Sequence, residues 1–331
     1  MKRLFSWSAR PQLAFDVGTA NIRVISAADG VLLDEPSVCC FDHRATPSTL
    51  IAAGAEAQLM LDRTPQGLKV QRPLYRGVLQ DLEAACALLT YARRQVVGRS
   101  RLRAGPTLIG IPADATEVER RALLTAAEEG GFGRVRLVSE PMAAAIGAGL
   151  PIAEARASML IECGAGTTEV VVISLGGVAV RKTVRVGGDA LDRAISDHVH
   201  MEHRVTIGAQ TARRVKLELS ATGTDDAASL VSLKGRRLGS GLPTVLTLPS
   251  SDFDPVVRKH ARPIIEAVKD CLAQTPPELS HDVCEFGVTL TGGSAYLPWL
   301  GAMITDLSGL EVRVAEHAEH CVARGLQQML H

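Results

Sequence analysis

The chain has 331 residues, of which 46% are hydrophobic and 22% are charged, so it is long enough for two domains that each bury a core. Lys plus Arg and Asp plus Glu both number 36, and this balance argues against nucleic acid as the main partner. We find no run of about 18 apolar residues, and the N-terminus lacks the apolar segment of a secretory signal. The seven cysteines include no Cys-x-x-Cys pair, so we expect buried thiols in a reducing cytosol rather than a zinc ribbon.

An internal repeat is the most informative feature of the chain. Residues 13–26 read LAFDVGTANIRVIS, and residues 159–174 read MLIECGAGTTEVVVIS. Each copy has an apolar strand with an acid near its end, Asp16 or Glu162, followed by a glycine-containing turn and a second strand. Two copies of one β-hairpin predict two structurally related halves that face one cleft.

The segment between the two copies alternates helices with strands. We expect helices over 81–96 and 117–129, and strands over 107–111 and 134–138. Thr116 and Glu119 have the spacing of a capping box at the start of the second helix. Glu140 and Pro141 then open an Ala-rich helix, with proline in the first turn.

The part of the chain after the second hairpin continues this alternation. We expect helices from Gly187-Gly188-Asp189 to about 203, over 209–220 and over 252–274, a loop at 275–277, and a strand over 286–290 that leads through 291–294 into another helix. Residues 221–250 are rich in Gly, Ser and Thr and indicate strands and loops of an inserted subdomain. Strands that alternate with helices predict an α/β fold.

Three glycine turns are candidate binding loops. Asp16-x-Gly18-Thr19 and Glu162-x-Gly164-Ala165-Gly166-Thr167 both put small residues at a strand end, where backbone N–H groups can approach a phosphate. A tight hairpin explains either loop alone, but two matching loops favour phosphate binding, with the acids holding a hydrated Mg²⁺. The third turn, 291–294, follows a buried strand and opens a helix, which suits the sugar and base of a nucleotide.

The two common nucleotide fingerprints, G-x-x-x-x-G-K-[ST] and G-x-G-x-x-G, do not occur. The three turns instead resemble the phosphate-1, phosphate-2 and adenosine motifs of the actin, heat-shock chaperone and sugar-kinase superfamily. Within it, the chain is similar to the MreB family along nearly its whole length. The stretches that carry this resemblance include DVGTANIRV (16–24), ATEVERRALLTAAEEGG (115–131), SEPMAAAIGAGLPIAEA (139–155) and VRVGGDALDRAI (184–195).

The resemblance implies an actin-like α/β fold with two related α/β halves around a nucleotide cleft, each with a smaller subdomain. The implied boundaries are 1–33, 71–146 and 316–331 for subdomain IA, 34–70 for IB, 147–183 and 251–315 for IIA, and 184–250 for IIB.

The same resemblance implies ATP and Mg²⁺ as ligands. Asp16 and Glu162 would hold the metal through water, while Glu140 and Thr167 would position the attacking water, consistent with a reaction that depends on positioning. Without the resemblance, Glu140 is better explained as a helix-entry carboxylate favoured by the macrodipole. The other nucleotide contacts implied are Gly18, Thr19, Ala20, Asn21, Gly164, Ala165, Gly166, Gly187, Gly188, Arg213, Lys216, Gly292, Gly293 and Ser294.

Four residues depart from the family pattern. Glu162 stands where an Asp is expected, and Ala165 replaces a glycine, which is harmless only if its φ is negative. Arg213 occupies the place of a Glu that would meet the ribose or adenine, and Arg76 replaces an acid before Gly77. These changes affect the expected rate of hydrolysis more than the fold.

Two further features remain outside these motifs. The first ten residues predict an interfacial amphipathic helix, with Leu4, Phe5 and Trp7 inserted in the membrane and basic residues on the other side, although a solvated terminus is the alternative. The histidines His198, His200 and His203, and the pair His317 and His320, have no acid constellation beside them in the sequence. We therefore expect solvated helix faces there rather than metal ligands.

Three functions are compatible with these observations. The leading hypothesis is a cytoplasmic ATP-binding protein at the inner face of the cell membrane. Such a protein would polymerise with itself, hydrolyse ATP slowly, and scaffold cell-wall elongation proteins and rod shape. The second is a paralogue that binds nucleotide but barely hydrolyses it and acts as a static scaffold or regulator. A small-molecule kinase of the same fold is the third.

Overall fold

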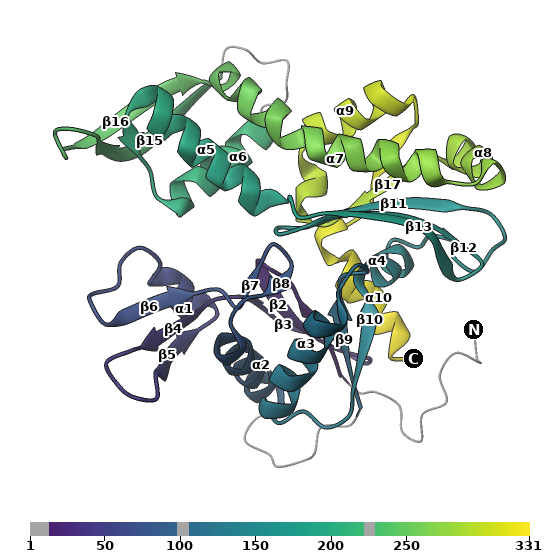
Figure 1. Cartoon of the computed structure of the whole chain (residues 1–331), viewed down its shortest axis with the longest axis horizontal. Coiled ribbons are helices and arrows are strands. Elements are labelled where there is room, and N and C mark those ends of the chain that lie inside the picture. Colours follow the sequence, from purple (N-terminus) through teal and green to yellow (C-terminus); the bar gives the residue numbers. More distant parts are fainter. Residues whose placement is uncertain (1–12, 98–105, 222–228) are drawn as a thin grey trace. The chain divides into compact units, whose positions relative to one another are not determined.

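The computed structural model describes residues 13–97, 106–221 and 229–331, and the chain forms two compact units. Unit 1 contains residues 1–151 and 320–331, and unit 2 contains residues 152–319. The predicted membrane-binding residues Leu4, Phe5 and Trp7 lie outside the described residues. Each unit contains a five-stranded sheet with helices, which confirms the predicted α/β class (Figure 1).

The sheet of unit 1 has the strand order β10-β9-β1-β2-β3 (Figure 1). Its strands are β1 (Leu13–Val17), β2 (Asn21–Ser26), β3 (Gly30–Pro36), β9 (Thr107–Ile111) and β10 (Val135–Ser139). β1, β9 and β10 pair in parallel, whereas β1, β2 and β3 pair antiparallel. Phe15 and Val17 lie on one face of β1 and join one core with α2 (Leu82–Val97) and α3 (Glu117–Glu129).

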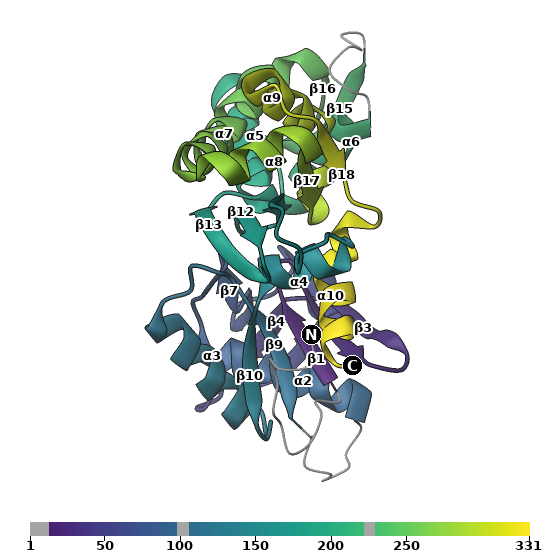
Figure 2. The ribbon, with the colours of Figure 1, turned by 90° about the vertical axis from the view of Figure 1, so that its right-hand side faces the viewer.

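The C-terminal helix of the chain belongs to unit 1. α10 (Cys321–Met329) contacts β1, β2 and β3 and lies beside α4 (Glu140–Gly147) (Figure 2). The two helices meet at glycines: a Cβ on Gly147 would lie 1.9 Å from the Cys321 carbonyl oxygen, and a Cβ on Gly325 would lie 1.7 Å from that of Ala143. Only glycine permits this close approach of the two backbones. Gly147 and Gly325 therefore allow α10 to pack directly against α4.

Unit 1 also carries a smaller sheet, with the order β5-β4-β6. Its elements are β4 (Cys39–Asp42), β5 (Thr49–Ala53), β6 (Leu68–Gln71) and the short helix α1 (Ala55–Leu59). Val38, Cys40 and Ala57 form its own small core. A two-stranded ladder of β7 (Leu74–Tyr75) and β8 (Val78–Leu79) then leads into α2.

The sheet of unit 2 repeats the topology of the first, with the order β13-β12-β11-β17-β18. Its strands are β11 (Ser158–Cys163), β12 (Thr168–Ser174), β13 (Gly177–Val184), β17 (Val288–Thr291) and β18 (Val312–Val314). β11 pairs antiparallel with β12 and parallel with β17, as β1 does with β2 and β9. Both sheets even have a register shift at matching places, Val24/Ile25 and Val172/Ile173. The predicted pair of related halves is therefore confirmed.

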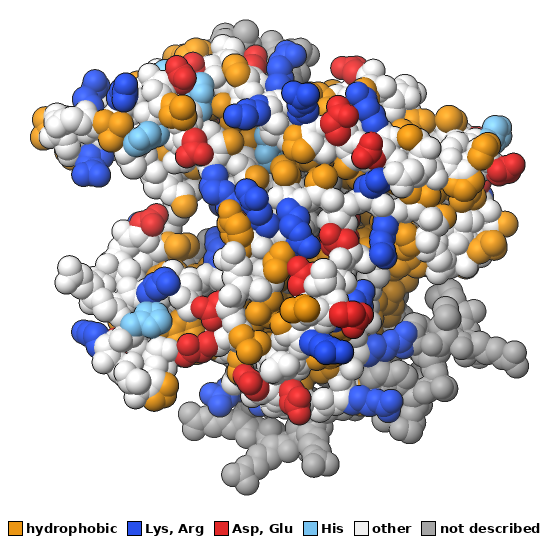
Figure 3. All heavy atoms as spheres, viewed as in Figure 1, with side chains coloured by type: hydrophobic (Ala, Val, Ile, Leu, Met, Phe, Trp, Pro, Cys, Tyr) orange, Lys and Arg blue, Asp and Glu red, His pale blue; other side chains and the backbone are white. Residues whose placement is uncertain are grey.

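One continuous core runs through unit 2 and includes Ile161 and Val172 of the sheet and Ile264 and Val268 of the long helix α7 (Asp254–Gln274). A second sheet with the order β14-β15-β16 joins this core through Val231 and Leu233. The remaining elements are α5 (Gly188–His203), β14 (Val205–Thr206), α6 (Ala209–Ala221), β15 (Leu230–Arg237), β16 (Pro243–Pro249), η1 (Ser250–Phe253), α8 (Pro277–Phe286), η2 (Gly293–Tyr296), α9 (Pro298–Ser308) and η3 (Ala318–His320). On the face drawn in Figure 3, acidic and basic side chains are interspersed.

The local sequence signals predicted most elements closely. Thr116 and Glu119 form the expected capping box, and the helix that they cap spans Glu117–Glu129 as predicted. The sequence analysis missed α8, which begins within the predicted loop at Pro277 and continues to Phe286. Proline in the first turn of a helix is compatible with helix, because the N–H that it lacks has no partner there.

Candidate functional site

The turns after β1 and β11 share one backbone geometry. The Gly18 N–H donates to the Asn21 carbonyl at 3.0 Å, and the Gly164 N–H donates to the Thr167 carbonyl at 2.9 Å. A Cβ on Gly18 would lie 3.0 Å from the Asn21 oxygen, which leaves little room for a side chain. Ala165 is not among the residues with positive φ, so the exchange of a glycine for Ala165 brings no backbone strain.

Asp16 is buried in unit 1 and is bonded to a cation of the same hairpin. Arg23 Nη1 donates to Asp16 Oδ2 at 3.0 Å, and Arg23 Nε donates to Asp34 Oδ2 at 2.9 Å. Burial raises the pKa of Asp16 and Arg23 lowers it, and the net shift is upward from 3.8. The sequence analysis missed Arg23, although it stands directly opposite Asp16 in the β1–β2 register. The charge of the predicted metal ligand is therefore already offset.

Three contacts from outside the hairpin hold the first turn. The buried Thr19 hydroxyl accepts a hydrogen bond from the Gly77 N–H at 3.2 Å, and Arg72 Nη1 donates to the Thr19 carbonyl at 3.2 Å. Ser37 Oγ donates to the Gly18 carbonyl at 2.7 Å. The turn of 18–21 is thus fixed by the strand and loop segments that follow it in unit 1.

Glu140 is the first residue of α4 and directly follows β10. A Cβ on Gly110 of β9 would lie 3.2 Å from Glu140 Cγ, so Gly110 leaves the space that this side chain occupies. Because β1, β9 and β10 are parallel, Glu140 and the 18–21 turn lie at the same edge of the sheet. Ligands of α/β proteins bind at this carboxyl edge.

Glu162 of unit 2 faces a second acid. It stands opposite Glu169 in the β11–β12 register, and carboxylate oxygens of the two side chains lie within 4.8 Å of one another. Glu169 is only 1% exposed, and Thr183 Oγ1 donates to its Oε1 at 3.4 Å. Like charges directly opposite on a sheet repel each other, so a hydrated divalent cation fits this pair.

The turn at residues 164–167 contacts residues 187–188 at the start of α5. The Gly188 N–H donates to the Gly164 carbonyl at 3.1 Å, and the Asp189 N–H donates to that of Ala165 at 2.9 Å. A Cβ on Gly187 would lie 2.5 Å from the Gly164 oxygen, so this contact requires glycine. The structure therefore brings together residues 164–167 and 187–188, which lie about 20 positions apart in the sequence.

The third turn joins the same place. Gly292 has a φ of 83°, and a Cβ there would lie 2.4 Å from the Cys163 carbonyl oxygen. Ser294 Oγ donates to the Gly164 carbonyl at 3.1 Å, and a Cβ on Gly293 would meet nothing within 4 Å. The turn at 292–294 thus lies against the turn at 164–167, with open space at Gly293.

Two charged side chains complete this part of unit 2. Lys216 Nζ donates to the Gly188 carbonyl at 3.0 Å and lies 2.8 Å from Asp192 Oδ1. Burial raises the pKa of Asp192, and Lys216 lowers it. Asp192 was not predicted, because only the packing of α5 against α6 places it beside Lys216. Arg213 is exposed on α6. Glycine backbone, an ammonium and a carboxylate suit a ligand with phosphates and sugar hydroxyls.

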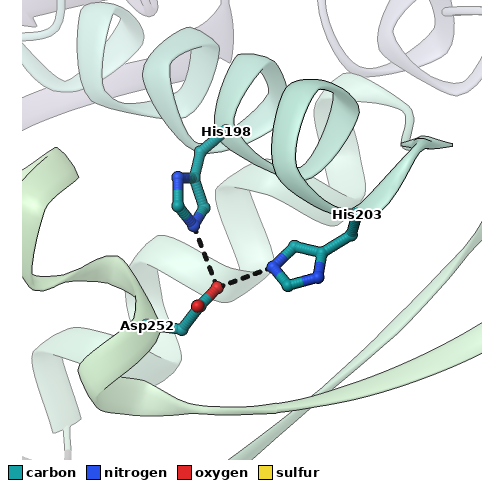
Figure 4. A group of neighbouring side chains, drawn as sticks. All are labelled: His198, His203 and Asp252. Carbon is teal, nitrogen blue, oxygen red and sulfur yellow. Dashed lines mark hydrogen bonds and ion pairs between the residues drawn. The ribbon is translucent and has the colours of Figure 1, made fainter.

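The expectation that the α5 histidines lack an acidic neighbour is wrong for two of them. His198 Nε2 and His203 Nε2 each lie 2.9 Å from Asp252 Oδ2 (Figure 4). The acid lies far along the chain, which is why the sequence pattern did not reveal it. His200 is exposed and contacts Thr206 Oγ1 at 3.5 Å.

Known proteins match this chain along nearly its whole length. The model of the MreB/Mbl protein family matches residues 10–331. The cell shape-determining protein MreB of Escherichia coli strain K12 is 40% identical over 316 residues, which cover 95% of this chain and 91% of that protein. The chain belongs to the MreB/Mbl family. The cell shape-determining protein Mbl of Bacillus subtilis strain 168 is 35% identical over 318 residues, 96% of this chain and 95% of the relative.

Solved structures agree with this family membership. MreB5 of Spiroplasma citri bound to ADP has a TM-score of 0.89 and 30% identity, with 96% of this chain and 95% of that chain covered. The same protein bound to AMPPNP matches equally well, with a TM-score of 0.89. A MamK double helical filament has a TM-score of 0.78 at 21% identity and supports the actin-like fold alone. Within the described parts of this MreB/Mbl-family chain, no helix combines the length and the apolar character needed to cross a membrane.

Proposed function

We propose that this MreB/Mbl-family protein binds ATP and polymerises into filaments that lie on the inner face of the cell membrane and scaffold cell-wall elongation and rod shape. The observation that carries the proposal is the meeting of residues 164–167, 187–188 and 292–294 in unit 2, where a Cβ on Gly187 or Gly292 would collide with backbone. The nucleotide complexes of MreB5 and the filament of MamK support it by analogy.

The nucleotide contacts follow the chemistry of each turn. The backbone of Gly164, Ala165, Gly166 and Thr167 is proposed to meet the phosphates, as are Asp16, Gly18, Thr19, Ala20 and Asn21 of unit 1. Gly187, Gly188, Lys216 and the turn Gly292–Ser294 are proposed to contact the nucleoside. Arg213 is exposed on α6 and offers only hydrogen-bond donors, so it cannot accept a hydrogen bond from a ribose hydroxyl or from the adenine amino group as a Glu would.

The metal is proposed to favour unit 2. A bound Mg²⁺ offsets phosphate charge, and Glu162 with Glu169 offers two neighbouring carboxylates for its water shell. Asp16 is already paired with Arg23 at 3.0 Å, so its contribution to the metal is weaker than a free carboxylate would make. Asp16 and Glu162 are both proposed to hold the metal through water, with the larger contribution from Glu162.

Hydrolysis is proposed to be slow. Glu140 and Thr167 are the candidates that orient the attacking water, since a carboxylate can polarise water and the reaction depends on positioning. The Arg23–Asp16 pair and the longer Glu162 side chain favour the second candidate function, a nucleotide-binding scaffold or regulator that barely hydrolyses ATP.

The first ten residues are proposed to bind the membrane surface through Leu4, Phe5 and Trp7. Basic residues near an anionic surface contribute about 1 kcal/mol each, and a filament repeats the anchor many times. Liposome co-sedimentation of the full chain and a chain without residues 1–10 tests this part separately. Equal binding by both would refute the anchor.

Pelleting and phosphate release test the central proposal. The purified chain with ATP and Mg²⁺ is expected to sediment and to form filaments in electron micrographs, whereas a small-molecule kinase would stay in the supernatant. Phosphate release from the same sample then separates an ATP-hydrolysing filament from a static scaffold. A chain that neither pellets nor binds fluorescent ATP would contradict the proposal. The matched control is Gly177→Ala, where a Cβ would make only an ordinary contact of 3.8 Å with the Ser174 oxygen, against Gly187→Ala, where it would collide with backbone.

A further inference from the structure

Two histidines and one carboxylate converge in unit 2 away from the glycine turns. His198 and His203 lie on α5, and Asp252 lies in η1 between β16 and α7. Each Nε2 is 2.9 Å from the same oxygen, Asp252 Oδ2 (Figure 4). The ring centroids of His198 and His203 lie 5.8 Å apart, and the planes of the two rings are inclined at 72° to each other.

The end of α5 makes this convergence possible. Residues five positions apart on a helix point about 140° away from each other, so His198 and His203 do not share a face by spacing alone. His203 is the last residue of α5, and Arg204 follows with a left-handed φ of 56°. The ring of His198 is supported from the other side by the buried Phe253, whose ring centroid is 5.5 Å away. Asp252 precedes Phe253, so the same anchor places both partners.

The local chemistry favours a cation. Asp252 Oδ2 lies against both imidazole nitrogens, so one oxygen and two nitrogen ligand atoms converge at one place. The side chains of His198, His203 and Asp252 are 16%, 22% and 28% exposed, and histidines are visible on the surface of this part of unit 2 (Figure 3). Ions from solvent can reach them.

We propose that His198, His203 and Asp252 form a binding site for a divalent transition cation of the zinc class. Their ligand atoms lie within 4.8 Å of one another. Tetrahedral zinc with bonds of about 2.0–2.2 Å needs ligand atoms about 3.4 Å apart, so each Nε2–Oδ2 distance has to widen by about half an ångström, and the two Nε2 atoms have to stand about as far from each other. Two imidazole nitrogens exclude Mg²⁺ and Ca²⁺, which prefer oxygen ligands, and favour Zn²⁺, Co²⁺, Ni²⁺ or Cu²⁺.

The ion joins two segments that are far apart in the chain. It links the end of α5 to the connection between β16 and α7, and so fixes the β14-β15-β16 sheet to the rest of unit 2. The other end of α5 is Gly188, which bonds to the Gly164 turn, about 22 Å of helix away. The cation site is therefore distinct from the candidate nucleotide turns.

Metal titration of the full-length protein tests the proposal. The background is Cys284→Ser, because Cys284 is an exposed thiol that would compete for the metal. After chelator treatment, the protein is titrated with Co²⁺, and its visible absorption is followed. We expect one Co²⁺ per chain, displaced by Zn²⁺.

Substitutions assign the ligands. His203→Gln and Asp252→Asn are each expected to weaken Co²⁺ binding by at least about tenfold. His200→Gln, an exposed histidine on the same helix, is the matched control and should leave binding unchanged. As a readout that needs no spectrum, Zn²⁺ should raise the melting temperature of the parent and of His200→Gln, but not of Asp252→Asn. Absence of stoichiometric Co²⁺ binding in the parent, or equal binding by His203→Gln and His200→Gln, would overturn the proposal.

Discussion

The hairpins β1–β2 and β11–β12 have the same backbone and different charges. Both turns close with a glycine N–H to carbonyl bond, at 3.0 Å and 2.9 Å. In unit 1, Arg23 stands opposite Asp16, whereas in unit 2, Glu169 stands opposite Glu162. The ladder and the glycine therefore determine the backbone, and one residue of the second strand determines the charge of each hairpin.

Because the two hairpins differ in charge, we expect them to contribute differently to metal binding. The first hairpin is neutralised by its own arginine, so it can be stable without a ligand. The second hairpin brings two carboxylates within 4.8 Å of one another, and we propose that it is the main site of the cation. That Asp16 and Glu162 both hold the metal through water stays a prediction, to which the structure adds the residue opposite each acid.

The largest expected effect comes from breaking the charge pair of unit 1. Arg23→Met should lower the free energy of unfolding by about 3 kcal/mol, because it leaves the buried Asp16 without its partner. The double variant Arg23→Met with Asp16→Asn should recover most of this loss. Urea denaturation followed by circular dichroism measures both.

Two controls bound this prediction. Arg44→Met removes an exposed arginine from an ion pair with Asp42 in the same unit, and should cost less than about 1 kcal/mol. Lys269→Met in unit 2 removes one partner of the exposed Lys269–Glu266 pair and should also cost less than about 1 kcal/mol. An equal loss for Arg23→Met and Arg44→Met would show that the buried pair has no special role.

Unit 2 contains a buried histidine that should make the stability of the protein depend on pH. Burial lowers the pKa of His260 in unit 2 to about 4, with a smaller contribution from Lys216. The folded protein keeps His260 neutral while the unfolded chain binds a proton below about pH 6.5, so stability is lost as pH falls from 6.5 to 4, by about 3 kcal/mol. Denaturation midpoints measured across this range should fall for the parent and much less for His260→Gln. His281→Gln, an exposed histidine of the same unit, should retain the parent's slope.

The next effect concerns the chemistry that we assign to unit 1. Glu140→Ala should lower ATP hydrolysis by about 100-fold while nucleotide affinity changes little, because water positioning matters mainly in the transition state. Glu117→Ala removes another carboxylate from the first turn of a helix and should leave hydrolysis unchanged. Phosphate release and fluorescent-nucleotide titration measure the two quantities. Loss of nucleotide binding in Glu140→Ala, or full activity, would contradict the assigned role.

The smallest effect is expected at the surface of unit 2. Arg213→Glu should tighten nucleotide binding up to about fivefold, the scale of an exposed charge contact, with a smaller effect on hydrolysis. Arg214→Glu, the exposed neighbour on α6, is the control for a simple change of net charge. If both variants alter affinity alike, Arg213 has no particular place at the nucleotide.

Sequence patterns alone determined the parts of this protein that depend on near neighbours. The repeated hairpin, the capping box of Thr116 and Glu119, and most helices and strands follow from periodicity, glycine and caps within a few residues. The long motif matches also predicted the family, which the comparisons confirm.

Tertiary structure decided the contacts between residues far apart in the chain. The pairing of Lys216 with Asp192 depends on how α5 packs against α6, and the meeting of Asp252 with His198 and His203 depends on where β16 ends. Arg23 and Glu169 are intermediate: the strand pattern contained them, but only the register showed that each faces an acid. Side-chain partners need positions in space, which local spacing supplies within one helix or hairpin and the packed fold supplies beyond it.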